Sequence, residues 1–262
     1  MKIRRSVILI SLSLAVILAS CVSRKQLTYL RYSAKSPHYD ITASDVRNYV
    51  TPPDYKIMPF DNLYIRVITP DPQWSDLFNV NTGMGGLTQE SAALSGYSVD
   101  LEGNIEIPYV GKISVAGKEI SEIKVELDTI FKNYVTDAEI SIRLVNNYLT
   151  VIGEVASPGR YPLSKDRVNV FEAVAMAGDL SHFSNRQKVQ LIRPSPYGPV
   201  VKEFTLLDRS ILTSELYYIM PNDIIYVMPS KGRTFQINSS FWTLFLTTIT
   251  SSLGIIGFFR TL

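Results

Sequence analysis

Two aspartates are the residues of this sequence best suited to acid–base chemistry. Asp61 and Asp223 occur in matching ten-residue segments, YKIMPFDNLY and YYIMPNDIIY. Glycan hydrolysis uses a pair of positioned carboxylates, so these two would serve a periplasmic glycan hydrolase or transferase. Each aspartate, however, follows Pro59 or Pro221 in a Pro-x-Asp turn, where proline presets φ and the aspartate bonds back to nearby amides. The sequence therefore favours a structural turn role for both carboxylates and predicts no enzyme.

Other nucleophiles and metal ligands are few. The chain has one cysteine, Cys21, and two histidines, His38 and His182, which are far apart in the sequence. The glycine-rich run at residues 83–86 lacks the strand, helix and lysine that accompany phosphate-binding loops. No triad, metal-ligand or cofactor spacing is present, so we predict no cofactor and no metal.

The cysteine stands at the end of an export signal. Residues 1–20 combine a basic head, an uncharged apolar run from Ser6 to Ala19, and small residues before the junction. The spacing resembles a bacterial lipobox and predicts that Cys21 is lipidated after the signal peptide is removed. The alternatives are an ordinary signal peptide with a chance cysteine, or an uncleaved anchor, for which the run falls short of the roughly 20 residues that a bilayer demands.

Charge excludes one class of partner. Removing the signal takes away three basic and no acidic residues, so the formal charge falls from +2 to about −1. Nucleic-acid binding depends on neutralising phosphates with basic side chains. We therefore predict no nucleic-acid partner.

The matching segments indicate an internal repeat. Six of their ten positions are identical, and each copy is predicted to form a strand, a turn and a second strand. Chance similarity between two short turns is the alternative. Two related β-rich units, one near each end of the folded region, are the better interpretation.

Hydrophobic periodicity predicts the elements of the first unit. Apolar and polar residues alternate in segments 97–101 and 105–109, on either side of Glu102-Gly103-Asn104, and this pattern predicts a hairpin. Apolar residues from Ile120 to Tyr134 have helical spacing, with a possible start at Ser121, and residues 138–145 predict a strand. The polar segment 71–96 is predicted to be a mobile surface loop.

A second set of strands follows. Residues 148–153 and 161–163 predict strands around a Ser-Pro-Gly turn, and a short helix at Val170–Ala175 is expected to end at Gly178. Further strands are predicted at residues 188–193, 200–206 and 224–228. Strands around a single helix suggest a β-grasp-like α+β unit. Residues 21–54 are expected to form a tether or, equally, an arm packed on the domain.

The C-terminal segment is uncharged from Thr234 to Phe259. A helix of this length, at about 1.5 Å per residue, would exceed the thickness of a bilayer core, so we predict a membrane helix at residues 234–260. A lipid-facing stripe is predicted at Trp242, Phe245, Ile249, Leu253 and Ile256. A stripe for helix packing or pore lining is predicted at Thr243, Thr247, Thr250, Gly254 and Gly257, because small and hydroxyl residues let helices approach closely. A lone anchor and a buried core helix are the alternatives.

These motifs together resemble the outer-membrane polysaccharide export lipoproteins of the Wza type. Y-x-I-x-P-x-D-x-L at residues 55–63 looks like the opening of the polysaccharide-export domain, and D-x-x-G-x-I-x-x-P-x-x-G-x-I-x-V-x-G at 100–117 looks like its hairpin signature. V-x-G-x-V-x-x-P-G-x-Y at 151–161, followed by A-x-x-x-A-G at 173–178, looks like the start of an SLBB (soluble-ligand-binding β-grasp) domain. Better-known members carry two SLBB domains, whereas this chain has room for one.

The resemblance implies an α+β protein with a polysaccharide-export domain, one SLBB β-grasp-like domain and a C-terminal membrane helix. The expected boundaries are a signal peptide at 1–20, a tether at 21–54, the export domain at 55–146, the SLBB domain at 147–230 and the helix at 234–260. The implied protein is a homo-oligomeric ring in the outer membrane, with periplasmic domains, that conducts capsular polysaccharide or exopolysaccharide. Its usual partner is an inner-membrane polysaccharide copolymerase of the tyrosine-kinase type. A glycan-binding or sensing lipoprotein without a pore is the alternative.

Overall fold

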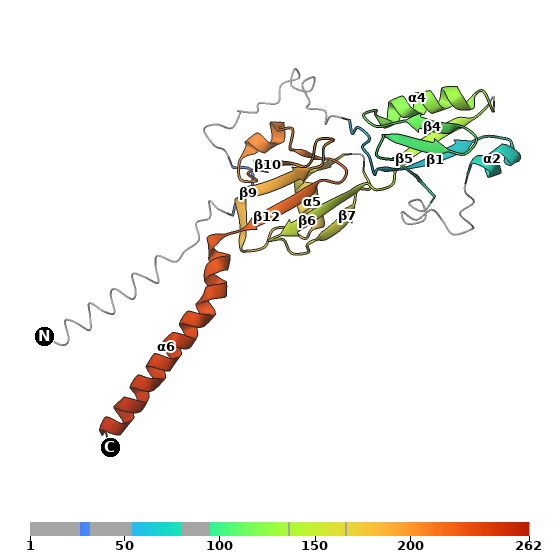
Figure 1. The fold of residues 1–262 in the computed structure, drawn as a ribbon. Coiled ribbons are helices and arrows are strands. Elements are labelled where there is room, and N and C mark those ends of the chain that lie inside the picture. Colours follow the sequence, from blue (N-terminus) through green and yellow to red (C-terminus); the bar gives the residue numbers. More distant parts are fainter. Residues whose placement is uncertain (1–26, 32–53, 80–94, 136, 166, 262) are drawn as a thin grey trace.

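The chain folds into two β-rich units and one long helix (Figure 1). The structure is a computed structural model that describes residues 27–31, 54–79, 95–135, 137–165 and 167–261. Both units combine helices with sheets, which confirms the predicted mixed α+β class. Each has its own buried apolar cluster.

The first unit is built on a three-stranded antiparallel sheet. Its elements are β1 (Asn62–Ile68), α2 (Pro72–Phe78), β2 (Tyr97–Ser98), β3 (Asn104–Ile107), β4 (Gly111–Ser114), α4 (Ile120–Phe131) and β5 (Glu139–Leu144). The sheet order is β2-β1-β5, and β3 and β4 form a separate hairpin. Alternate residues of β1 face the core, as expected of a strand with one buried side.

Helix α4 covers this core. Ile123, Leu127 and Phe131 recur at four-residue intervals and are almost completely buried. The helix begins at Ile120, one residue before the predicted start, because Glu122 accepts a 2.8 Å hydrogen bond from the Glu119 backbone N–H and so helps to cap the first turn.

The predicted pairing of residues 97–101 with 105–109 is wrong. A tight turn does lie between them, since Asp100 N–H donates to the Asn104 carbonyl at 2.8 Å. However, β2 pairs with β1, and β3 pairs with β4 instead. The chain reverses a second time between β3 and β4, where Tyr109 and Gly111 have φ angles of +67° and +96°.

The predicted loop at residues 71–96 contains a helix. Asp71 caps α2 by accepting a 2.9 Å hydrogen bond from Gln73 N–H, and Pro72 occupies the first turn, where its missing N–H costs nothing. Phe78 is buried in the core of the first unit. Its ring contributes the apolar surface that fixes this part of the segment, while residues 80–94 lie outside the described part.

The second unit is a five-stranded sheet in the order β10-β9-β12-β6-β7. Its elements are β6 (Tyr148–Gly153), β7 (Gly159–Pro162), β8 (Val168–Asn169), α5 (Val170–Met176), β9 (Ser184–Arg193), β10 (Val200–Phe204), η3 (Arg209–Thr213), β11 (Tyr218–Ile219) and β12 (Ile224–Pro229). Strand β12 runs parallel to β6 and antiparallel to β9. Helix α5 is capped by Asn169, and its buried residues join those of β6 in one core.

Two segments lie outside these units in sequence. Residues 27–31, which fall in the predicted tether, pack against the second unit. Helix α6 (Lys231–Thr261) follows β12 directly and extends away from the second unit (Figure 1).

Candidate functional site

The two Pro-x-Asp turns of the repeat have the same geometry. Asp61 accepts a 2.8 Å hydrogen bond from Met58 N–H, and Asp223 accepts one of 2.8 Å from Met220 N–H. The residue before each aspartate has a left-handed φ, +72° at Phe60 and +64° at the equivalent residue of the second turn. The sequence similarity therefore corresponds to a repeated local structure.

The first aspartate is held by neutral donors. Asp61 is only 2% exposed and also accepts hydrogen bonds from the Tyr55 hydroxyl at 2.9 Å and from Asn146 Nδ2 at 3.1 Å. Burial raises the pKa of the Asp61 carboxyl, although these donors and Met58 N–H oppose the shift. Burial and the neighbouring Asp61 charge raise the pKa of Tyr55 in turn.

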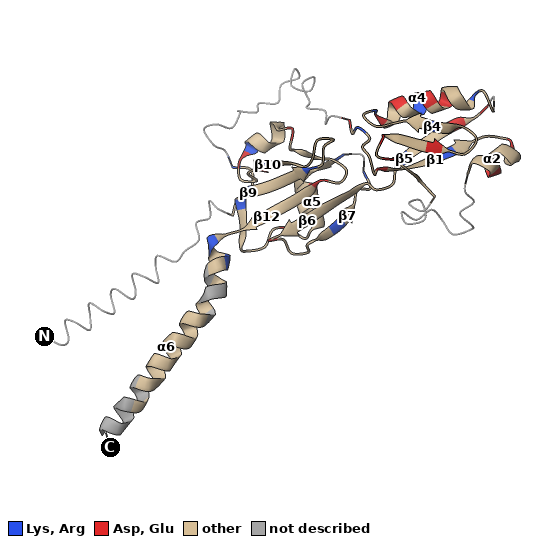
Figure 2. Ribbon diagram, viewed as in Figure 1, with Lys and Arg blue, Asp and Glu red and all other residues tan. Residues whose placement is uncertain are grey.

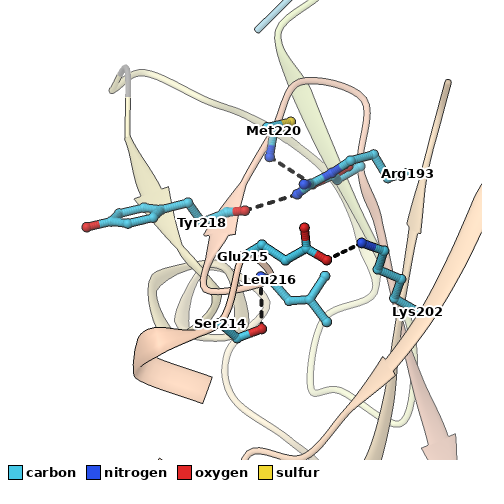
Figure 3. Close-up of polar contacts among 8 residues, drawn as sticks. Arg193, Lys202, Ser214, Glu215, Leu216, Tyr218 and Met220 are labelled. Atoms are coloured by element: carbon cyan, nitrogen blue, oxygen red, sulfur yellow. Dashed lines mark hydrogen bonds and ion pairs between the residues drawn. The ribbon is translucent and has the colours of Figure 1, made fainter. Parts of the chain in front are cut away.

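The second aspartate is held by a cation. Asp223 is fully buried, and Arg193 Nη2 donates to its Oδ2 at 2.7 Å. The same nitrogen donates to the Tyr218 carbonyl at 3.0 Å (Figure 3). Burial raises the pKa of Asp223, and the Arg193 charge lowers it. The nearby Lys202–Glu215 pair in Figure 3 lies on the exposed side of the same region.

The two turns lie next to each other through Tyr55. Hydrogen bonding by the Asn222 side chain lowers the pKa of the Tyr55 hydroxyl, and the Asp223 charge raises it. Both carboxylates, however, are buried and engaged by donors of their own chain. Asp61 and Asp223 are therefore not accessible to a sugar as a pair, and each accepts the backbone bond of its own turn. Among the described residues, no group of His, Cys, Asp and Glu side chains could hold a metal ion.

The three-residue connector 145–147 joins the units. Asn146 accepts from Asn62 N–H at 3.0 Å and donates to Asp61, both in the first unit. Asn147 donates from Nδ2 to the Leu163 carbonyl at 3.2 Å in the second unit. Each asparagine is therefore tied to one unit, and the connector has little freedom of its own.

Helix α6 exposes most of its described side chains. Trp242, Phe245 and Ile249, from the predicted lipid-facing stripe, are exposed in the structure. Phe241 and Leu246 are exposed as well. The Lys and Arg positions coloured on α6 in Figure 2 lie at its start, where the sequence has Lys231 and Arg233, and Arg260 follows near its end. The core-helix alternative does not hold for these side chains.

The hydroxyl stripe of α6 is satisfied within the helix. Thr243, Thr247 and Thr250 each donate to the carbonyl four residues earlier, at 2.7, 2.9 and 3.0 Å. Gly254 and Gly257 lie in the same helix. Of the lipid-facing set, the side chains of Leu253 and Ile256 lie outside the described part, as does Cys21.

The predicted membrane span is not supported. Among the residues that the structure describes, none of the helices has both the length and the apolarity needed to cross a membrane. Serine, threonine and glycine interrupt the apolar run of α6.

Comparison with known proteins identifies the first unit. Residues 50–145 match the family model described as polysaccharide biosynthesis/export protein. These residues span the first unit, which is called the export domain below after this match. This match confirms the resemblance to the polysaccharide export proteins, while the SLBB domain at residues 147–230 stays a prediction.

Relatives of the chain carry related names. The EPS I polysaccharide export outer membrane protein EpsA of Ralstonia nicotianae is 32% identical over 92 residues, which are 34% of this chain and 24% of that protein. The capsule polysaccharide export outer membrane protein CtrA of Neisseria meningitidis serogroup A is 25% identical over 170 residues, 61% of this chain and 43% of that protein. The exopolysaccharide production protein ExoF of Rhizobium meliloti is 27% identical over 139 residues, 52% of this chain and 30% of that protein. The chain spans less than half the length of each, and two of these names agree with the predicted outer-membrane location.

Sequence reasoning missed an aromatic cluster on the export domain. The buried Phe78 stacks on Trp74 at 5.9 Å and meets the edges of Phe131, Tyr109 and Tyr134 at 5.1 to 6.4 Å. The four-residue spacing of Trp74 and Phe78 was the available signal, because it places both rings on one face of a helix. The polar composition of the surrounding segment, residues 71–96, hid this spacing.

Proposed function

We propose that copies of this chain form an oligomeric channel that exports capsular polysaccharide or exopolysaccharide across the outer membrane. Cys21 would carry the lipid, and the export domain and the second unit, as an SLBB-type β-grasp domain, would face the periplasm. An inner-membrane polysaccharide copolymerase of the tyrosine-kinase type would deliver the polymer. The match of residues 50–145 to the export family supports the substrate class.

The exposed apolar surface of α6 is the observation that carries the assembly part of the proposal. Phe241, Leu244 and Leu246 are 71%, 67% and 58% exposed on a helix that touches the second unit only near its start. Soluble monomers rarely leave so much contiguous apolar surface in water. We therefore infer that α6 packs against α6 of neighbouring copies in a ring.

The threonine stripe fits the interior of such a ring. Its hydroxyl protons are already donated to helix carbonyls, so close packing or contact with a sugar leaves no donor unsatisfied. A lining of weak acceptors also suits a moving polymer, because tight sites would hold it in place.

Deleting Ser240–Leu262 tests the proposal. The export domain and the second unit should keep their unfolding midpoint, because the deleted residues pack on neither. Ring particles in detergent, seen by negative-stain microscopy and mass measurement, should be lost together with surface polysaccharide, while polymer synthesis continues. Survival of both rings and surface polysaccharide would exclude the α6 assembly.

A matched pair of substitutions separates assembly from general damage. Phe245→Lys places a charge on the exposed apolar face and should abolish rings. Lys231→Ala changes an exposed residue of the first turn and should leave them intact. If the unaltered protein forms no rings but binds polysaccharide as a monomer, the result would instead favour a glycan-binding lipoprotein without a pore.

A further inference from the structure

The segment Leu27–Arg31, here called the strap, is bound along the second unit. Leu30 N–H donates to the Leu206 carbonyl at 3.1 Å, and Arg31 N–H donates to the Leu207 carbonyl. Arg209 Nε donates to the Leu30 carbonyl at 2.9 Å. These three bonds fix the backbone of a bent segment, in which Leu30 has a left-handed φ of +51°, against residues that follow β10.

Tyr29 is the side chain that anchors the strap. Its hydroxyl donates to Asp179 Oδ1 at 2.6 Å, its ring meets Phe171 edge-on at 6.2 Å, and the Arg186 guanidinium lies 5.5 Å from its centre. A hydrogen bond, an aromatic contact and a cation–π contact thus converge on one ring. Phe171, Asp179 and Arg186 together make a socket for a tyrosine in a bent peptide segment.

The same loop that supplies Asp179 also contacts the start of α6. Within residues 179–184, the Ser181 hydroxyl donates to Glu154 at 2.6 Å, and Glu154 pairs with Arg233 of α6 at 3.2 Å. The Phe183 carbonyl accepts a 2.6 Å hydrogen bond from Ser230 N–H, and its ring lies under Arg233 at 5.7 Å. One short loop therefore contacts the strap at its start and the first turn of α6 at its end.

We propose that the second unit carries a peptide-binding socket whose ligand is the chain's own strap, and that the loop 179–184 couples an occupied socket to the orientation of α6. The strap, which follows Cys21 in the sequence, and the first turn of α6 are then both held by the loop 179–184. Loss of the strap leaves the Asp179 carboxylate with the Leu180 N–H but without the Tyr29 hydroxyl, and loosens the hydrogen bond between Phe183 and Ser230. This coupling is a property of the single chain and does not depend on ring formation or on the polysaccharide.

Amide hydrogen exchange of the full-length protein tests both parts. In the unaltered protein, the Leu30, Arg31 and Ser230 amides should exchange slowly. Tyr29→Ala should accelerate Leu30 and Arg31 at least tenfold and Ser230 several-fold, and Tyr29→Phe should have an intermediate effect because it keeps the ring and loses the hydrogen bond. Tyr197→Ala is the matched control, since Tyr197 is fully exposed.

The outcomes separate the claims. Unchanged exchange at Leu30 and Arg31 in Tyr29→Ala would overturn the socket, and unchanged exchange at Ser230 alone would overturn the coupling. Millimolar peptide LTYLR, the sequence of the strap, should restore Ser230 protection in Tyr29→Ala. Protection of Leu30 that rises with protein concentration would show that the strap comes from a second copy and would overturn docking within one chain.

Discussion

The Arg193 guanidinium and the buried Asp223 carboxylate form a three-bond ion pair, with Nε–Oδ1, Nε–Oδ2 and Nη2–Oδ2 distances of 3.0, 3.3 and 2.7 Å. The equivalent turn of the export domain has the same backbone bond but uses Tyr55 and Asn146, which are neutral, around Asp61. One turn motif is thus supported by a charge in one copy and by neutral donors in the other. The two turns should therefore differ in how much a substitution of their supporting residues lowers the stability of the protein.

Removing either member of the Arg193–Asp223 pair should be strongly destabilising. We expect Asp223→Ala and Arg193→Ala each to lower the free energy of unfolding by about 3–5 kcal/mol, because the partner charge is left unpaired in a buried site. Glu215→Ala, which breaks the exposed pair with Lys202, should have a much smaller effect. Urea unfolding checks all three, and equal costs for Asp223→Ala and Glu215→Ala would contradict the expectation.

Exchanging Phe60 and Asn222 tests backbone strain in the repeated turn. Phe60 adopts a φ of +72°, is 73% exposed and therefore loses little packing when replaced. Because asparagine tolerates the left-handed region better, Phe60→Asn should raise the free energy of unfolding by about 0.5–1 kcal/mol. The reverse change, Asn222→Phe, should destabilise the protein. A destabilised Phe60→Asn protein would argue that the exposed ring has a partner that supports it.

Gly153→Ala should be among the most damaging small substitutions. Gly153 has a φ of +95°, and an added Cβ would lie 2.1 Å from the Val227 carbonyl oxygen. Strain and the backbone clash together should cost more than about 2 kcal/mol. Gly117→Ala, with a φ of +78° and open space around the Cβ, isolates the strain and should cost less. Thermal unfolding of the two variants should rank them in this order.

Strap docking should fail in strong base. Burial and Asp179 raise the pKa of Tyr29 to about 12 from its ordinary value of 10.0. The folded state therefore favours the neutral phenol, so this contribution to stability is fully present below pH 10 and disappears as the pH rises towards about 12. Titration of tyrosinate absorbance should show one late-titrating tyrosine fewer in Tyr29→Phe, while Tyr55 and Tyr97, whose pKa values burial also raises, still titrate late. An unchanged set of late-titrating tyrosines in Tyr29→Phe would contradict the expectation.

The sequence predicted elements whose periodicity is local and missed those that depend on distant partners. The alternation of residues 148–153 and the helical spacing after Ile120 each came from packing on one face, and both elements are present. The partner of β2 could not be read from the turn beside it, because β1 lies more than thirty residues earlier in the chain. Helix α2 is fixed by burial of Phe78 in a core that other segments supply.

The candidate site shows the same division. The turn residues could be recognised because the same sequence pattern occurs twice in the chain. Arg193, Asn146 and the strap socket were not, since each acts on a residue at least thirty positions away, and no local pattern records that contact.

Strands β6 and β12 give the second unit a defined mechanical property. The export domain is attached to the start of β6 and α6 to the end of β12, and the two strands are parallel neighbours paired from Thr150–Ile224 to Gly153–Val227. A force that pulls the export domain away from α6 would slide these strands past each other in shear. All the hydrogen bonds between them then share the load at once, instead of opening one by one as in an unzipping hairpin.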